Sequence, residues 1–138
     1  MKSEKPAKQI AALPFRKRRG RVEILLITSR ETRRWIIPKG WPIDGLKDYN
    51  AARLEALEEA GVKGRMKKNP IGHFEYLKRL KNGEVKLCRI QVYSLHVNAV
   101  LRNWMEKGQR QRTWFSVEKA VSQVQEVGLR RIIMSIFI

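Results

Sequence analysis

The chain has few acidic residues and a single cysteine. Asp and Glu total 13 against 30 Lys and Arg, which gives a formal net charge of +17 at pH 7. One cysteine excludes an internal disulfide, and no Cys/His spacing typical of a zinc site accompanies it. We expect Cys88 to be a buried structural thiol, because it lies in an alternating apolar stretch.

No apolar stretch is long enough to cross a bilayer, which takes roughly 18–20 apolar residues. The longest apolar block covers residues 132–138 and is interrupted by Ser135. The chain begins MKSEKPAK, which is charged and lacks the apolar region of a secretory signal. We therefore expect a cytoplasmic protein with no membrane partner. No feature of the sequence indicates an oligomeric state.

The excess of Lys and Arg creates a field that attracts polyanions such as RNA, DNA, polyphosphates and anionic lipid surfaces. Charge alone does not choose among them, and a solvated basic surface is the simpler alternative. The densest basic run, RKRRGR at residues 16–21, lies between two apolar segments. We expect this run at the exposed tip of a hairpin.

Apolar patterning predicts one α+β domain over residues 1–138, with a mixed sheet covered by helices and a flexible start at residues 1–8. Strands are expected at residues 9–15, 21–28, 71–80, 85–97 and 111–115. Pro14 lacks an amide proton, which predicts an edge strand or a bulge there. Asn82-Gly83 predicts a hairpin turn, because both residues tolerate positive φ.

Three helices are expected. The first covers residues 48–60, with Asp48 as its N-cap and Gly61 at the left-handed position that ends it. The second covers residues 117–124 and is capped by Ser116. The third has a buried face made of Leu129, Ile132, Ile133 and Ile136.

Three glutamates lie close together on the first predicted helix. At about 100° per residue, Glu55, Glu58 and Glu59 fall within one arc of roughly 100°. Like charges at this spacing repel one another, and the negative end of the helix dipole adds to the cost. A divalent cation would relieve both, and Mg²⁺ prefers one or two carboxylates together with phosphates. The alternative is a solvent-facing acidic patch, which spacing alone favours.

The segment around these glutamates resembles the Nudix box. Residues 40–62 read GWPIDGLKDYNAARLEALEEAGV, and the family pattern is G-x5-E-x7-R-E-U-x-E-E-x-G-U, where U is apolar. The matching positions are Gly40, Glu55, Ala56, Glu58, Glu59, Gly61 and Val62. The preceding WIIPKG at residues 35–40 is similar to the lead-in of the dinucleoside-polyphosphate and diphosphoinositol-polyphosphate hydrolases. The resemblance covers about residues 9–133.

The resemblance implies an α/β/α sandwich around a central mixed sheet, and a hydrolase that uses Mg²⁺ or Mn²⁺. Carried over by position, Glu55 and Glu59 would ligate the metal together with the Gly40 carbonyl. Glu58 would bind a second metal or accept the proton from the attacking water, so Glu58 and Glu55 are the predicted catalytic residues. These roles suit carboxylates, because a metal lowers the pKa of bound water and a nearby base completes its activation.

Two positions of the box depart from the pattern. Leu46 stands where the family has Glu, and Leu54 stands where it has the Arg that braces the carboxylates. Arg53 points about 160° away from the carboxylates and does not replace that brace. We expect Leu46 and Leu54 to pack together as an apolar pair in place of an ion pair. We also expect a weakened enzyme whose turnover Leu54→Arg would raise.

Basic residues near the box are the predicted substrate contacts. Lys39 directly precedes the box, and Arg30, Arg33 and Arg34 would bind distal phosphates. Glu106 could approach the metal from a loop, but a surface role is the favoured interpretation. Three functions remain open: hydrolysis of a dinucleoside polyphosphate or a diphosphoinositol-polyphosphate-like substrate, removal of pyrophosphate from RNA 5′ ends, and binding of a nucleotide or RNA by a catalytically weakened Nudix-fold module.

Overall fold

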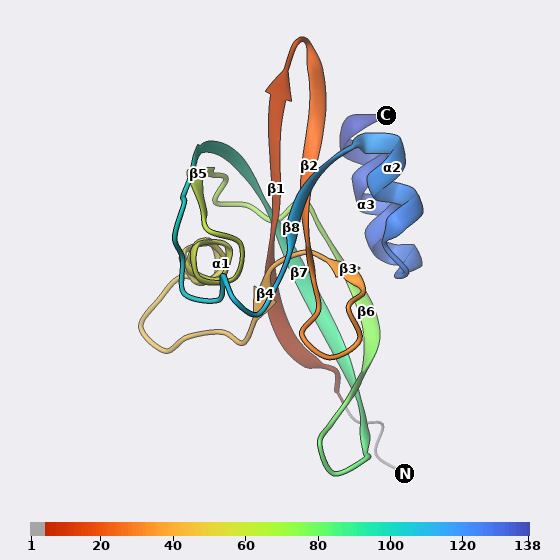
Figure 1. Ribbon diagram of the computed structural model, residues 1–138. Helices are drawn as coiled ribbons and strands as arrows, with labels where there is room; N and C mark the ends of the chain where they lie inside the picture. The colour runs from red at the N-terminus through yellow and green to blue at the C-terminus, as the bar shows by residue number, and fades with distance from the viewer. Residues whose placement is uncertain (1–4) are drawn as a thin grey trace.

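The computed structural model describes residues 5–138 and consists of one mixed sheet between two helical layers (Figure 1). The predicted α+β fold, an α/β/α sandwich, is confirmed. The strands are β1 (Ala7–Arg18), β2 (Arg21–Thr28), β3 (Trp35–Ile36), β4 (Lys39–Gly40), β5 (Val62–Met66), β6 (Gly72–Arg79), β7 (Val85–Val100) and β8 (Arg112–Ser116). The helical segments are α1 (Asp48–Glu55), its π-helical continuation η1 (Ala56–Ala60), α2 (Val117–Gln123) and α3 (Val127–Phe137).

Strands β1 and β7 form the centre of the sheet and run parallel to each other. β1 also pairs with β4 through its first half and with β2 through its second half, in both cases antiparallel. At 16 residues, β7 is long enough to pair with β6 along its first half and with β5 along its second. β3 and β8 both pair with β2. The site described below lies beside the short strand β4.

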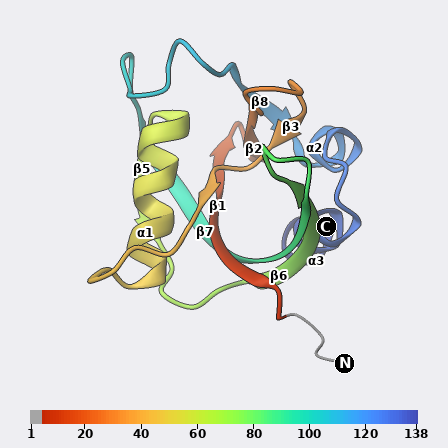
Figure 2. The same cartoon turned by 90° about the horizontal axis from the view of Figure 1, so that it is seen from below.

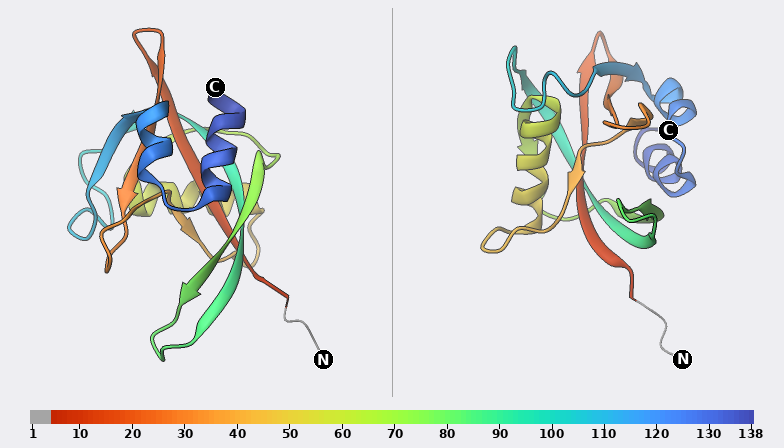
Figure 3. Two further views of the ribbon diagram at one scale, coloured as in Figure 1. Left: turned by 90° about the vertical axis from the view of Figure 1, so that its right-hand side faces the viewer. Right: turned by 60° about the horizontal axis from the view of Figure 1, so that its bottom comes forward.

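The central strands read as nearly continuous apolar runs because both of their faces are covered. On β1, Ile10 and Ala12 belong to the core under α1, while Ala11 and Leu13 belong to the core under α2 and α3. Figure 2 shows α1 on one side of the sheet and α3 on the other. The left view of Figure 3 shows α2 and α3 side by side over their face of the sheet.

Pro14 lies in the centre of the sheet, so the prediction of an edge strand or a bulge is wrong. The pairing of β1 with β7 continues through Pro14. On the other side of β1, the pairing with β4 ends at Ala11 and the pairing with β2 begins at Phe15. The N–H of Ala12 donates to the carbonyl of Pro38 at 3.0 Å. The backbone N of residue 14 points to the same side of β1 as the N–H of Ala12. On that side neither β4 nor β2 pairs with residue 14, so a residue without an N–H loses no hydrogen bond there.

The basic run lies at a hairpin tip, as predicted. Arg19 and Gly20 form the turn between β1 and β2 with φ of 53° and 76°, and Figure 1 shows this hairpin extending beyond the helices. The β6–β7 hairpin turns at Asn82-Gly83, as predicted. Only Gly83 of the pair has a positive φ, and the Asn82 side chain instead accepts a hydrogen bond from the N–H of Glu84. Such a bond to the backbone two residues on is typical of Asn in turns.

Two of the predicted helix ends are confirmed and one is wrong. Gly61 ends the first helix with φ 66°, and the Ser116 side chain accepts a hydrogen bond from the N–H of Lys119 at the start of α2. The N-cap of α1 is Lys47, however, so the prediction of Asp48 is wrong. Asp48 is the first helical residue, where its charge suits the helix dipole.

Three further differences concern burial and extent. Ile136 is 44% exposed, although Leu129, Ile132 and Ile133 form the buried face of α3 as predicted. Residues 7 and 8 are already paired in β1, so the predicted flexible start is wrong there, and residues 1–4 lie outside the described part of the chain. Strand β5 was not predicted, because VKGRM offers only two apolar residues. Among residues 5–138, no helix is long and apolar enough to cross a membrane.

Candidate active site

The three glutamates lie where the first helix changes its winding. The helix packs on the sheet through small, fully buried side chains, namely Ala51, Ala52, Ala56 and Ala60. It changes from α to π geometry at Ala56, within the glutamate segment. A π turn is wider than an α turn and is common at functional sites, where it changes the direction of side chains. Glu55 is therefore the last α-helical residue, and Glu58 and Glu59 lie in the π-helical turn that follows it.

Glu59 is the most buried of the three glutamates, with 7% of its surface exposed. Its Oε1 accepts a hydrogen bond from the backbone N–H of Lys39 at 3.2 Å, and its Oε2 lies 3.9 Å from Nη2 of Arg110. Burial and a hydrogen bond with the Glu55 carboxylate raise the pKa of Glu59 to about 8, against the opposing charge of Arg110. Two carboxylates in contact away from water need a proton or a cation between them.

Glu55 lies directly over Gly40 of β4. A Cβ atom built on Gly40 would collide with the Glu55 carboxylate, 2.9 Å from Oε2 and closer still to Oε1. Burial raises the pKa of Glu55, and the charges of Glu58 and Glu106 act in the same direction. Glu58 is half-buried, and its carbonyl accepts a hydrogen bond from the N–H of Glu106 at 3.0 Å. Glu106 therefore lies beside this cluster with its side chain 16% exposed, so the favoured surface role is wrong, and its approach to a metal from the loop stays a prediction.

The donor atoms of this cluster suit a hard divalent cation. Within residues 5–138, no group of three or more His, Cys, Asp or Glu side chains is arranged to hold a metal ion. Mg²⁺ usually takes one or two carboxylates and completes its shell with water and substrate phosphate. Glu55 and Glu59 offer two adjacent carboxylates beside the bare backbone of Gly40, and burial is the main cause of the raised pKa of each.

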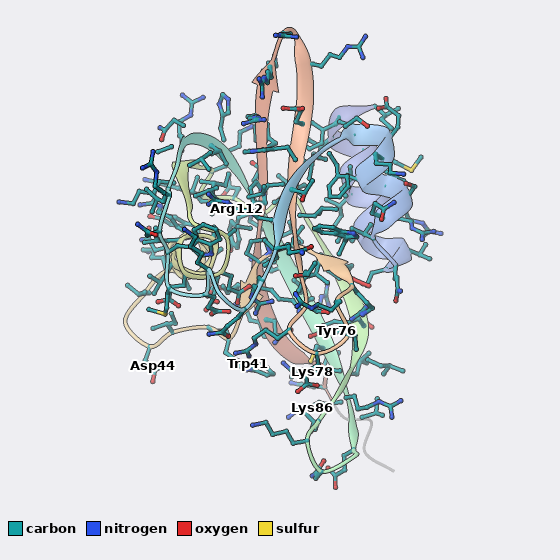
Figure 4. All side chains as sticks on the ribbon, in the orientation of Figure 1. Trp41, Asp44, Tyr76, Lys78, Lys86 and Arg112 are labelled. Atoms are coloured by element: carbon teal, nitrogen blue, oxygen red, sulfur yellow. The ribbon has the colours of Figure 1, made fainter. Side chains whose placement is uncertain are left out.

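Lys39 lies at the same site, together with residues that the sequence did not single out. Burial lowers the pKa of Lys39, and the charge of Glu59 opposes this shift. Its Nζ is 5.4 Å from the ring centroid of Tyr76, and Nζ of Lys78 is 5.2 Å from the ring centroid of Trp41. Figure 4 shows Trp41, Tyr76 and Lys78 on one side of the molecule. Two lysines and two aromatic rings therefore border the glutamate cluster on the side of β4 and β6.

Of the three predicted arginines, the structure brings Arg34 next to Lys39. The two line a small cavity, and Nη1 of Arg34 pairs with Glu126 at 3.2 Å. Arg30 is exposed, with Nη1 3.4 Å from Oε1 of Gln109. Arg33 is exposed in a turn at φ 56°. Substrate binding by these three arginines stays a prediction, as do the catalytic and metal-binding roles of the glutamates.

The predicted packing of Leu46 against Leu54 is wrong. Leu46 is 42% exposed, whereas Leu54 is half-buried on α1. The preceding Gly45 has φ 85°, and the N–H of Leu46 donates to the carbonyl of Ile43 at 3.1 Å. This tight turn holds Leu46 in the exposed loop before the helix. The two leucines therefore do not replace an ion pair with a buried apolar pair.

Two residues that the sequence analysis missed hold the end of η1. The Arg112 guanidinium donates to the carbonyls of Ala60, Gly61 and Leu101 at 2.9, 3.2 and 2.6 Å, and it stacks on Trp104 at 3.7 Å from the ring centroid. Nε1 of Trp104 donates to the carbonyl of Glu59 at 3.2 Å. The bonds to Ala60 and Glu59 satisfy carbonyls at the helix end, where no further turn supplies N–H donors. Sequence spacing gives no sign of them, because they join segments far apart in the chain.

Arg112→Met is expected to destabilise the protein by about 2 kcal/mol, because three partly buried carbonyls lose a charged donor. The midpoint of thermal denaturation should fall by roughly 6 °C. The control is Arg102→Met, an exposed arginine in the segment before β8, which should change the midpoint by less than about 2 °C. Equal midpoints for the two variants would show that Arg112 does not hold the helix end.

Comparison with known proteins agrees with this geometry. No family model matches the chain. Diphosphoinositol polyphosphate phosphohydrolase 3-beta of Bos taurus is 36% identical over 120 residues, which cover 86% of this chain and 69% of that protein. Nudix hydrolase 12, mitochondrial, of Arabidopsis thaliana is 32% identical over 104 residues, which cover 73% of this chain and 51% of that protein. The chain thus spans about half the length of the plant relative.

A solved structure shows the same fold. The Ap4A hydrolase of C. elegans matches with a TM-score of 0.67 at 21% identity, over 94% of this chain and 95% of that chain. The relatives are named as hydrolases, in agreement with the predicted enzyme class. The box resemblance is confirmed: the chain belongs to the Nudix hydrolase family, in the branch that includes the diphosphoinositol polyphosphate phosphohydrolases.

Proposed function

We propose that this protein hydrolyses a pyrophosphate linkage in a small polyanionic substrate at the site of Glu55, Glu58 and Glu59. The observation that carries the proposal is the contact between the half-buried carboxylate of Glu55 and the buried carboxylate of Glu59, beside Gly40. This pair lies in the part of the chain that matches the Nudix box. The names of the relatives, diphosphoinositol polyphosphate phosphohydrolase and Ap4A hydrolase, support this reaction class.

Each residue of the site has a role in this reaction. Glu55, Glu59 and the carbonyl of Gly40 would hold Mg²⁺ or Mn²⁺. Such an ion neutralises phosphate charge and lowers the pKa of bound water. Glu58 accepts the proton of the attacking water, as the bond from water to phosphorus forms and the bond to the bridging oxygen breaks. Lys39 neutralises charge on the phosphate groups.

The surroundings of the site favour a dinucleoside polyphosphate, with a diphosphoinositol-polyphosphate-like compound as the other member of the class. Lys39, Lys78 and Arg34 provide positive charge along β3, β4 and β6. Trp41 is 46% exposed beside Lys78, and such a ring offers a flat surface on which a nucleobase stacks. RNA 5′ ends are the second candidate, because the net charge of +17 and the exposed basic hairpin tip suit a phosphate backbone.

The experiment is a substrate panel with and without Mg²⁺. It contains a dinucleoside polyphosphate, a diphosphoinositol polyphosphate, a nucleoside-diphosphate sugar and a 5′-triphosphate RNA, and the products are separated by ion-exchange chromatography. We expect metal-dependent cleavage that is fastest for the dinucleoside polyphosphate. Fastest cleavage of the RNA would favour the second candidate. Binding without cleavage of any member would contradict the proposal and indicate a binding module. The cytoplasmic location and the single domain over residues 1–138 also stay predictions.

A further inference from the structure

The helix that carries the glutamates does not present a bracing arginine to them. Position 54, where the family has that arginine, is the half-buried Leu54, and the neighbouring Arg53 is exposed. The cation that reaches the carboxylates comes instead from the segment between β7 and β8. It is Arg110, whose side chain is 8% exposed.

The guanidinium of Arg110 makes two hydrogen bonds and one longer ion-pair contact. Nε donates to Oε1 of Glu106 at 2.8 Å, Nη1 donates to the carbonyl of Thr28 at 3.1 Å, and Nη2 lies 3.9 Å from Oε2 of Glu59. Glu106 in turn donates its N–H to the carbonyl of Glu58 at 3.0 Å. Because the guanidinium is planar and its donors form a rigid fork, these partners set the position of one another. Arg110 thereby connects β2, the segment before β8 and the end of η1.

We infer that Arg110 is a positioning residue that holds Glu59 and Glu106 in place of the missing box arginine. The inference rests on the proposed function, since it assigns to Arg110 the orientation of carboxylates that would bind the metal. If Arg110 contributed only its positive charge, its removal would have a different effect on metal affinity. A positive charge beside a ligand repels a second cation, so its removal would strengthen metal binding. Removal of a residue that orients ligands weakens metal binding.

The two roles therefore predict opposite changes in Mn²⁺ affinity, measured by electron paramagnetic resonance without any substrate. Arg110→Met should weaken Mn²⁺ binding about 10-fold. Arg110→Lys should lie between wild type and Arg110→Met, because lysine keeps the charge and loses the fork. The control is Arg102→Met, which removes an exposed arginine from the same segment and should leave the affinity unchanged.

A second variant tests the replacement itself. Leu54→Arg in the Arg110→Met background returns a cation to the box position, and it should recover several-fold of the lost Mn²⁺ affinity. The same substitution in the wild type should have a smaller effect. If Arg110→Met does not fold, the comparison of Arg110→Lys with wild type decides the question. Unchanged or stronger Mn²⁺ binding in the folded Arg110 variants would overturn the inference. Failure of the wild-type protein to bind Mn²⁺ would instead overturn the proposed function.

Discussion

Glu59→Gln is expected to lower metal-dependent hydrolysis by roughly 1,000-fold, within the range for loss of an essential acidic group. Glu59 is buried, contacts Glu55 and accepts the N–H of Lys39, so its oxygens are the best positioned to ligate an ion. Glutamine has nearly the same shape and keeps one acceptor oxygen. The substitution therefore removes the charge with little change in packing. The assay is hydrolysis of the best substrate of the panel over a range of Mg²⁺ concentrations.

The same variant is expected to stabilise the protein when no metal is present. The pKa of Glu59 is about 8 in the folded protein and near 4.5 in the unfolded chain. Between these values the folded state binds the extra proton, so stability falls as the pH rises through this window. Glutamine has no proton to lose, and Glu59→Gln should raise the thermal midpoint at pH 7.5 by roughly 3–5 °C.

The control for both effects is Glu75→Gln, which alters an exposed glutamate of β6. Its activity and its thermal midpoint should equal those of the wild type. If Glu59→Gln kept full activity, Glu59 would not be a metal ligand. If Glu59→Gln lowered the thermal midpoint of the metal-free protein, the claim that burial of the Glu59 carboxylate destabilises the fold would be wrong.

Gly40→Ala is expected to reduce hydrolysis about 100-fold and to leave the fold intact. The added Cβ would occupy the space of the Glu55 carboxylate, which is the far end of a flexible side chain. Glu55 can turn away at small cost to stability, but it then leaves the position next to Glu59. Activity and Mn²⁺ affinity should fall together, while the thermal midpoint changes by no more than about 3 °C.

Gly108→Ala is the matched control for this substitution. An added Cβ at Gly108 meets nothing within 4 Å, so activity and stability should stay at the wild-type values. Equal activity of Gly40→Ala and Gly108→Ala would show that the contact between Gly40 and Glu55 has no part in catalysis.

Local patterns predicted the parts of the fold that depend on neighbours in the sequence. The apolar runs of β1 and β2, the cap at Ser116 and the left-handed Gly61 are properties of a few adjacent residues, and they appear as expected. Pro14 and β5 were misjudged because their pairing depends on what lies beside them. A proline in a central strand is acceptable here only because β4 ends before it and β2 begins after it.

In the candidate site, too, local patterns predicted some residues, while contacts between distant segments could not be predicted. The box spacing identified Glu55, Glu59, Gly40 and Lys39, which the structure brings together. The spacing could not identify Arg110, because that residue reaches Glu59 from 51 positions further along the chain. The missing box arginine predicted a weakened enzyme, and the inferred role of Arg110 would compensate part of that loss. The expected gain from Leu54→Arg in the wild type is accordingly smaller than the sequence alone suggested.

Incorporation of ¹⁸O from labelled water into the products tests the central claim most directly. Wild-type protein is incubated with Mg²⁺ and a dinucleoside polyphosphate in H₂¹⁸O, and the products are analysed by mass spectrometry. We predict one ¹⁸O atom on a terminal phosphate of one product, formed only with Mg²⁺ and lost with Glu59→Gln. Labelled product that forms equally well without a divalent metal, or in the Glu59→Gln variant, would contradict hydrolysis at the three-glutamate site.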